Sequence, residues 1–177
     1  MKRKKLLFLF MCLCVLTGLR SQDTEFWFVA PQSGIQTLNN GGFVFTNTST
    51  NSPARVTITY YKSGLSETIN IGPGQGARRI IDRTFSTANV ENMMINAGNV
   101  VPCGIHIEST EKLVAYYMFD ASATKDIFTL KGKAALGTEF FVPQTTDGFY
   151  INGDPGTGNN YPNAFDQIDI VATEDNT

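Results

Sequence analysis

Residues 24–32 read Thr-Glu-Phe-Trp-Phe-Val-Ala-Pro-Gln, and a shortened version returns at residues 138–144 as Thr-Glu-Phe-Phe-Val-Pro-Gln. Both copies join Thr-Glu-Phe to a short apolar run and a Pro-Gln ending, and both lead into polar, turn-rich sequence. A second pair of comparable runs lies at residues 43–48 and 168–173. Because internal repetition indicates a modular chain, the sequence predicts a β module that begins twice.

Four more stretches alternate polar and apolar residues, at 55–60, 67–71, 104–108 and 112–119. Such alternation, bounded by Gly, Pro, Asn and Ser, is typical of half-buried strands. In the first of them Val56, Ile58 and Tyr60 share one face. Residues 86–97 could hold one short helical turn. The pattern predicts an all-β fold, an antiparallel β-sandwich of Ig-like modules.

The repeat suggests three parts: a signal peptide at 1–21, a β-sandwich module at 22–122 and the start of a second module at 123–177. The second copy ends before counterparts of the later strands. Half a sandwich leaves unpaired strand edges, which natural proteins avoid, so we expect a longer polypeptide. The alternative is that residues 126–177 add strands to the first module and make one larger domain.

The N-terminal residues have the pattern of a secretory signal peptide. Lys2-Arg3-Lys4-Lys5 precedes an apolar run at residues 6–16, and small residues follow up to Ser21. The apolar run is short for a membrane span, although an N-terminal anchor is the alternative. We expect cleavage after Ser21, a secreted or cell-surface location, and no membrane span in the mature chain.

Cleavage would leave nine Lys and Arg against 16 Asp and Glu, a formal net charge of −7. Nucleic acids and anionic membranes require clustered basic residues to neutralise phosphate. The charge therefore argues against both as partners.

Catalytic motifs are absent from the sequence. Cys103 would be the only cysteine left after cleavage, so no internal disulfide is expected. His106 is the only histidine, and at a spacing of three on a strand the two side chains face opposite sides. No Gly-x-Ser-x-Gly elbow accompanies them. We interpret Cys103 as a buried or half-buried structural cysteine and His106 as a solvent-facing strand residue.

A weak calcium site is possible in the C-terminal part, with Asp154, Asp166 and Asp169 as candidate ligands. Calcium takes about six to eight oxygen ligands, and exported modules often bind it weakly. The surrounding loop does not match the EF-hand spacing. A solvated polar loop is the favoured interpretation, and no cofactor is expected.

The aromatic run at Phe26, Trp27 and Phe28 offers two interpretations. Trp27 could form a stacking platform for a sugar, or it could anchor the core. Large aromatic residues supply much buried area to a sandwich, so core packing of Trp27 is favoured. Asn47-Thr48-Ser49 also matches a glycosylation acceptor, which we regard as coincidental.

Six runs occur in order: 24–27 (Thr-Glu-Phe-Trp), 103–109 (Cys-Gly-Ile-His-Ile-Glu-Ser), 114–117 (Val-Ala-Tyr-Tyr), 126–130 (Asp-Ile-Phe-Thr-Leu), 135–140 (Ala-Leu-Gly-Thr-Glu-Phe) and 170–177 (Ile-Val-Ala-Thr-Glu-Asp-Asn-Thr). Together they resemble the N-terminal domain of the IgGFc-binding protein family, which includes exported proteins of Bacteroidetes-type bacteria. Lys131 and Cys103 depart from the residues usual in the family, and the family domain is longer than this chain. The resemblance implies an extracellular recognition or adhesion module without catalysis, and it assigns no residue as an Fc contact.

The sequence therefore predicts an exported, non-enzymatic binding or adhesion module of a larger protein, with an extracellular protein or a glycan as its ligand. One alternative is a structural spacer in a surface or gliding-associated protein. Another is an accessory domain of an exported hydrolase.

Overall fold

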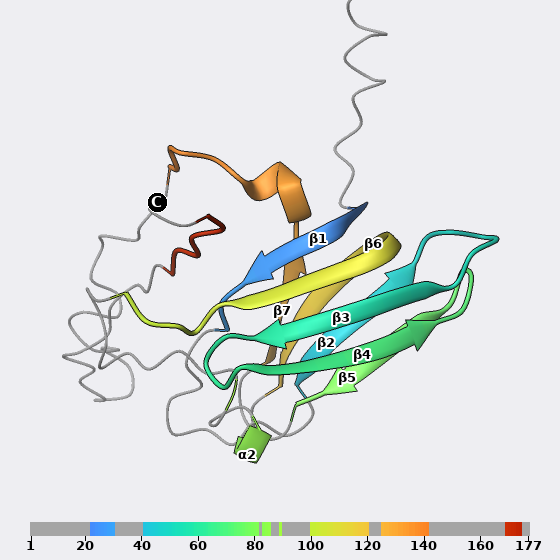
Figure 1. Ribbon diagram of the computed structural model, residues 1–177, viewed down its shortest axis with the longest axis horizontal. Coiled ribbons are helices and arrows are strands. Elements are labelled where there is room, and N and C mark those ends of the chain that lie inside the picture. The colour runs from blue at the N-terminus through green and yellow to red at the C-terminus, as the bar shows by residue number, and fades with distance from the viewer. Residues whose placement is uncertain are drawn as a thin grey trace, which may run out of the picture. The chain divides into compact units, whose positions relative to one another are not determined.

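The computed structural model describes residues 22–30, 41–81, 83–85, 89, 100–120, 125–141 and 169–174. The chain divides into two compact units, Met1–Leu136 and Gly137–Thr177. The strands of the first unit are β1 (Gln22–Phe28), β2 (Gly42–Asn47), β3 (Ala54–Tyr60), β4 (Leu65–Ile71), β5 (Gly76–Ile80), β6 (Ile105–Asp120) and β7 (Lys125–Leu130). They form one curled antiparallel sheet (Figure 1). The prediction of an all-β antiparallel fold is confirmed.

β3 and β4 coincide with the predicted strands, and the inward side chains Val56, Ile58 and Tyr60 are completely buried. The predicted strands at 104–108 and 112–119 are instead one continuous strand, the 16-residue β6. The only described helices are short, α2 (Arg83–Phe85) and the 3-10 helix η3 (Gly132–Ala135). Most of the predicted helical turn at 86–97 lies outside the described residues.

β6 is the strand around which the sheet is built, because it pairs with four others. Its first half lies between β1 and β3, where Ile107 pairs with both Phe26 and Ile58 (Figure 1). Its second half lies between β2 and β7, where Ala115 pairs with Phe45 and Leu130. The sheet therefore consists of two four-stranded halves that share β6.

A bend separates the two halves of β6. Glu25 pairs with Glu108, but Asp23 pairs with Leu113, so four residues of β6 (109–112) lie opposite the single residue Thr24 of β1. Extra residues in one strand bend it and increase its twist. This stretch of β6 is polar. It lies between the part of β6 that pairs with β3 and the part that pairs with β2.

The core lies on the inner face of the curled sheet. Odd-numbered residues of β6 point inward in both halves, and Ile105, Ile107, Leu113, Ala115 and Tyr117 are all buried. They pack with the completely buried side chains of the other strands, which are Phe26, Phe43, Phe45, Val56, Ile58 and Tyr60. Full burial of one large apolar side chain stabilises by roughly 1.5–3 kcal/mol. This cluster therefore holds the two halves together.

Gly42 begins β2 at a position that excludes a side chain. Its φ is +142°, and a Cβ there would lie 2.0 Å from the carbonyl oxygen of Arg79 in β5. Only glycine allows this close approach of two backbones. The pairing of β2 with β5 therefore depends on this residue.

Polar side chains tie β4 to β5 at the open edges of the two halves. The Tyr60 hydroxyl donates to Glu67 Oε1 at 2.5 Å, and Arg79 Nε donates to both Glu67 oxygens at 2.9 and 2.8 Å. The Arg79 guanidinium also lies 4.6 Å from the ring centroid of Phe85. This Tyr60–Glu67–Arg79 network links β3, β4 and β5.

The described residues of the second unit, 137–141 and 169–174, carry no strand. Phe140, Phe141 and Ile170 are exposed. The contact division falls after Leu136, and β7 pairs with β6 in the sheet of the first unit. The proposed duplication of the module stays a prediction.

Candidate functional site

Trp27 does not lie in the core, so the favoured sequence interpretation of this residue is wrong. Phe26 is completely buried and Phe28 packs against the core, so Trp27 between them points to the outer face of the sheet and is half-buried. Alternation along a strand allows one set inside or the other. If Trp27 pointed into the core, both Phe26 and Phe28 would point outward. The observed orientation places two aromatic side chains in the core instead of one.

Trp27 is one of three nearly parallel rings on this outer face. It pairs in register with His106 of β6, and their ring centroids lie 3.9 Å apart with an interplanar angle of 12°. Tyr61, which directly follows β3, lies 6.0 Å from Trp27 at an angle of 15°. The exposed fraction of Tyr61 is 48%. The rings thus present aromatic surface on a rigid sheet.

Glu25 fixes His106 beneath this surface. Its Oε1 lies 3.0 Å from His106 Nε2, and its Oε2 lies 3.3 Å from Lys133 Nζ. The hydrogen bond to His106, assisted by the contact with Lys133, holds the pKa of the Glu25 carboxyl below its usual value, although desolvation opposes this. Glu108 Oε2 lies 3.9 Å from His106 Nδ1 on the other side. The only histidine is therefore not a simple solvent-facing residue, since just 13% of its side chain is exposed.

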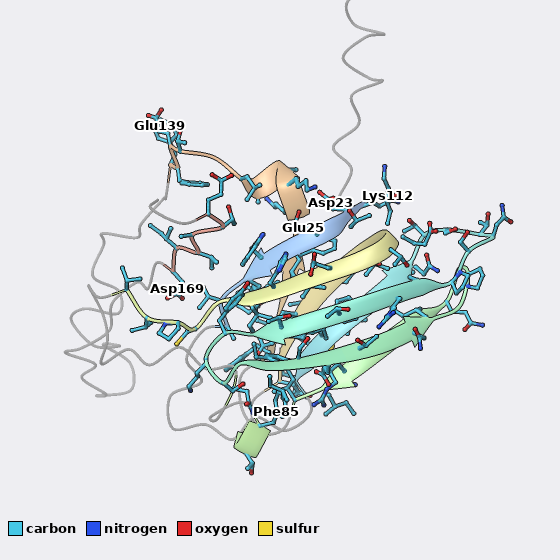
Figure 2. The ribbon with its side chains drawn as sticks, in the orientation of Figure 1. Asp23, Glu25, Phe85, Lys112, Glu139 and Asp169 are labelled. Carbon is cyan, nitrogen blue, oxygen red and sulfur yellow. The ribbon has the colours of Figure 1, made fainter. Side chains whose placement is uncertain are left out.

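Lys133 reaches Glu25 because η3 is attached to the start of β1. The Lys133 backbone N–H donates to Asp23 Oδ2 at 2.8 Å. Gly132 has a φ of +58°, and a Cβ on it would lie 2.4 Å from the Asp23 Cβ. Figure 2 shows Asp23 and Glu25 on β1 next to η3. We call Glu25, Trp27, Tyr61, His106, Glu108 and Lys133 together the Trp27 cluster.

Pairing extends the Trp27 cluster across the sheet in two rows of outward side chains. The first row is Trp27, His106, Thr59 and Ser66, from β1, β6, β3 and β4. The second row is Glu25, Glu108, Thr57 and Thr68 from the same strands. The Thr59 and Ser66 hydroxyl oxygens lie 3.4 Å apart. The outer face here is thus aromatic at one end and rich in hydroxyl groups at the other.

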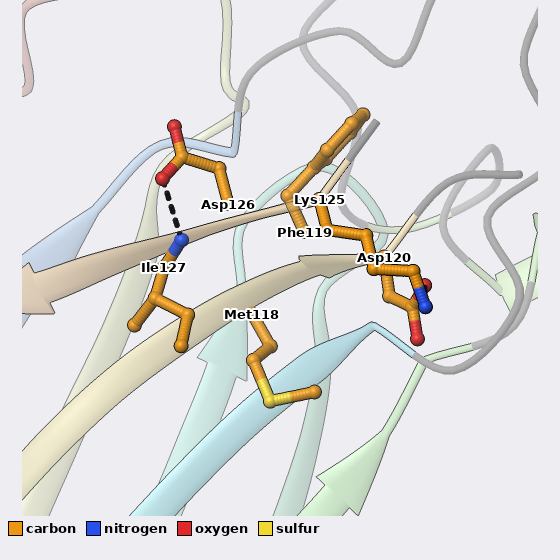
Figure 3. Close-up of a pocket in the computed structure, with 6 residues that line it drawn as sticks. All are labelled: Met118, Phe119, Asp120, Lys125, Asp126 and Ile127. Carbon is orange, nitrogen blue, oxygen red and sulfur yellow. Dashed lines mark hydrogen bonds and ion pairs between the residues drawn. The ribbon is translucent and has the colours of Figure 1, made fainter. Parts of the chain in front are cut away.

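A pocket of about 510 Å³ lies at the junction of β6 and β7 (Figure 3). Its lining residues are Met118, Phe119, Asp120, Lys125, Asp126 and Ile127. Asp120 Oδ1 lies 3.1 Å from Lys125 Nζ, yet the geometry gives this buried oxygen no hydrogen bond. Asp126 accepts a hydrogen bond from the Ile127 backbone N–H at 2.7 Å. The polar groups therefore interact mainly with one another, and the pocket offers less to a ligand than the Trp27 cluster.

The candidate calcium ligands are the remaining residues that the sequence singles out. Asp154 and Asp166 lie outside the described residues, and Asp169 is exposed in the second unit. No group of three or more His, Cys, Asp and Glu side chains able to hold a metal occurs in the described part of the chain. Calcium binding stays untested by the structure.

Cys103 is buried with 6% of its surface exposed, as predicted for a structural cysteine. Asn47 has 1% exposure, and its amide donates to the carbonyls of Ser52, Gly72 and Ile71. A glycosyl group could not be attached to it in the folded protein. The interior position of Asn47 agrees with the interpretation of this match as coincidental.

No helix in the described ranges has the length and apolarity that a membrane span requires.

No family model matches the chain, and no curated protein matches it. Among solved structures, the crystal structure of Thermotoga maritima 1070 is similar at 14% sequence identity and a TM-score of 0.34. The match covers 62% of this chain and 97% of that chain. A similarity this distant carries no argument about function. The resemblance to the IgGFc-binding family thus rests on the residue runs quoted above and is carried forward as a proposal.

Proposed function

We propose that this chain is an exported, non-catalytic binding or adhesion module of a larger secreted or cell-surface protein, similar to the N-terminal domain of IgGFc-binding proteins. The observation that carries the proposal is the Trp27 cluster, in which partly exposed rings are held on a sheet by ionic contacts. Rings that could be buried in the core are presented outward, and aromatic residues dominate the energetics of recognition surfaces.

The finer fold that we propose is an Ig-like sandwich. Its two layers would be the half that contains β1, β3 and β4 and the half that contains β2, β5 and β7, with β6 shared by both. Support comes from the buried cluster, which has side chains from both halves, and sandwiches pack their sheets through such inner faces. Secretion is proposed from the signal-like N-terminal sequence.

The proposal gives His106 a supporting role and no hydrolytic one. Its Nε2 contacts Glu25 and its ring is covered by Trp27. A general base needs a nucleophile or a substrate proton within hydrogen-bond reach. These contacts suit a histidine that supports an aromatic side chain.

A binding screen tests the proposed function. The full chain, immobilised through its C-terminus, is exposed to extracellular proteins (immunoglobulin G, fibronectin and mucin) and to a panel of polysaccharides. We expect saturable binding to at least one of them, and loss of that binding in a Trp27→Ala variant that is still folded. Failure to bind any of these ligands would favour the spacer alternative.

A further inference from the structure

We infer that the outer face around the Trp27 cluster is a binding site for a chain of neutral pyranose sugars. This inference rests on the proposed binding function and names its ligand class. A pyranose ring has a face of C–H groups and a rim of hydroxyl groups. The C–H face can contact aromatic rings through dispersion. The hydroxyl rim can form hydrogen bonds with hydroxyl, amide and carboxylate side chains.

The rings meet the first requirement. Trp27 is half-buried and Tyr61 is 48% exposed, so both keep accessible area, and the planes of the two rings lie within 15° of each other. His106 stacks on Trp27 at 3.9 Å and is itself held by Glu25. The Trp27 ring is therefore ordered before any ligand arrives, which reduces the entropy lost on binding.

The two rows meet the second requirement. Thr59 and Ser66 continue the row of Trp27 and His106, and Thr57 and Thr68 continue the row of Glu25 and Glu108. Strands lie about 4.8 Å apart, so a row over four strands is roughly 14 Å long. That length exceeds a single sugar ring, and we expect the ligand to lie along a row, with one ring on the aromatic end.

The composition of this face favours a sugar over a protein partner. Protein interfaces have an apolar core and few Ser, Glu and Lys residues. Here the two rows contain one apolar residue, Trp27, beside hydroxyl and carboxylate groups. An anionic polymer fits less well, because the Glu108 side chain is 63% exposed at the centre of the second row.

The test follows from the fact that Trp27 is the only tryptophan in the chain. The purified full chain is titrated with hydroxyethylcellulose, xylan, galactomannan and chitohexaose while the tryptophan emission is recorded. We expect a saturable change in emission with at least one of them. We also expect tighter binding of a hexasaccharide than of the matching disaccharide, because only the longer ligand spans the row.

Variants locate the site through retardation in gels that contain the polysaccharide. Trp27→Ala and Tyr61→Ala should each weaken binding roughly tenfold, which corresponds to about 1.4 kcal/mol. Tyr116→Ala is the matched control, because Tyr116 is a half-buried outer-face aromatic residue in the other half of β6. The Tyr116→Ala variant should bind the polysaccharide as tightly as the unaltered chain does. If Trp27→Ala does not fold, the exposed Tyr61 decides the result.

Three results would overturn the inference: no response to any neutral polysaccharide, equal losses in the Tyr61 and Tyr116 variants, or tighter binding to heparin or alginate than to the neutral chains. A chain that binds an extracellular protein but no polysaccharide overturns the ligand class and keeps the proposed function. A chain that binds neither overturns both.

Discussion

Asn47 shows what a single buried polar side chain does in this sheet. Its amide nitrogen lies 2.8 Å from the Ser52 carbonyl oxygen and 3.1 Å from that of Gly72, and its Oδ1 accepts from the Ser49 N–H at 3.0 Å. It thereby satisfies backbone groups of two loops that have no strand partner, which buried peptide groups require. In the sequence, Asn47-Thr48-Ser49 matches a motif that normally lies on the surface. The position of Asn47 at the end of β2 instead places its side chain in the interior.

Replacing Asn47 by aspartate removes the donor and places carboxylate oxygens against carbonyl oxygens. We expect Asn47→Asp to lower the free energy of unfolding by at least about 3 kcal/mol at pH 7, as for other uncompensated buried charges. Urea denaturation measures it. Asn70→Asp is the control, since Asn70 is exposed on β4 and should change stability by only about 0.5 kcal/mol. Equal losses in both would show that the Asn47 hydrogen bonds are not needed.

Glu25 makes the stability of the outer face depend on pH. Its folded pKa is lowered by the contact with His106, so its contribution is present above the unfolded pKa and is lost as the pH falls through the folded pKa. We expect Glu25→Gln to be less stable than the unaltered chain at pH 7, with a smaller difference at pH 3, below the unfolded pKa. Denaturation at both pH values measures this.

Glu108→Gln serves as the control for Glu25, because Glu108 is 63% exposed and 3.9 Å from the histidine, and exposed pairs contribute little. A Glu25 difference that stays constant between the two pH values would contradict the assigned role.

At the scale of elements, β6 is the feature that sequence patterns describe only in part. Period-two alternation correctly gives its inward residues in both halves. The predicted strands end at residue 108 and resume at residue 112, because the polar residues 109–111 between two apolar runs are typical of turns. In the structure this stretch is the bend between partners, where Thr110 Oγ1 accepts from the Arg55 N–H and the Lys112 carbonyl accepts from the Thr48 N–H. Such pairing partners are distant in sequence, so local alternation cannot reveal the continuity of the strand.

The Tyr60–Glu67–Arg79 network makes the stability of the folded chain depend on pH in the alkaline range. Burial raises the pKa of Tyr60, and the hydrogen bond to the Glu67 carboxylate raises it further. The folded state thus keeps the phenol proton that the unfolded state loses above about pH 10, so its stability falls as the pH rises above that value. We expect Tyr60→Phe to be destabilised by about 1.5–3 kcal/mol at pH 8 and by less at pH 11.

Tyr61→Phe is the control for the alkaline measurement, since Tyr61 is adjacent in sequence but 48% exposed. It should differ from the unaltered chain by a similar small amount at pH 8 and pH 11. A Tyr60→Phe difference that does not shrink between these values would contradict the assigned linkage.

At the scale of the whole molecule, the sequence correctly predicts the fold class, the positions of β3 and β4 and the buried state of Cys103. It predicts the outer-face site less well. Trp27 and His106 are 79 positions apart, and their contact exists because β1 pairs with β6 in one register. Alternation along the strand predicts only that Trp27 faces the opposite side from Phe26 and Phe28. Which of the two sides is buried depends on packing against the other strands.

The boundary of the first unit is a prediction that truncation tests. All seven strands of the sheet precede Gly137, whereas the division at residue 122 would remove β7. β7 pairs with six residues of β6, and its Leu130 is 3% exposed. We expect a chain that ends at Leu136 to keep the melting temperature of the full chain, because it retains every strand and every buried core side chain among the residues that the structure describes.

A chain that ends at Ser122 should melt at a much lower temperature. It exposes the second half of β6 as an unpaired edge and removes the contacts of Leu130 from the core. The point variant Leu130→Ala in the full chain isolates the packing part, with an expected loss of about 2–5 kcal/mol. Thermal unfolding followed by circular dichroism measures all three. If the chain ending at Ser122 is as stable as the one ending at Leu136, β7 does not belong to the first unit, and the division that the repeat predicts is correct.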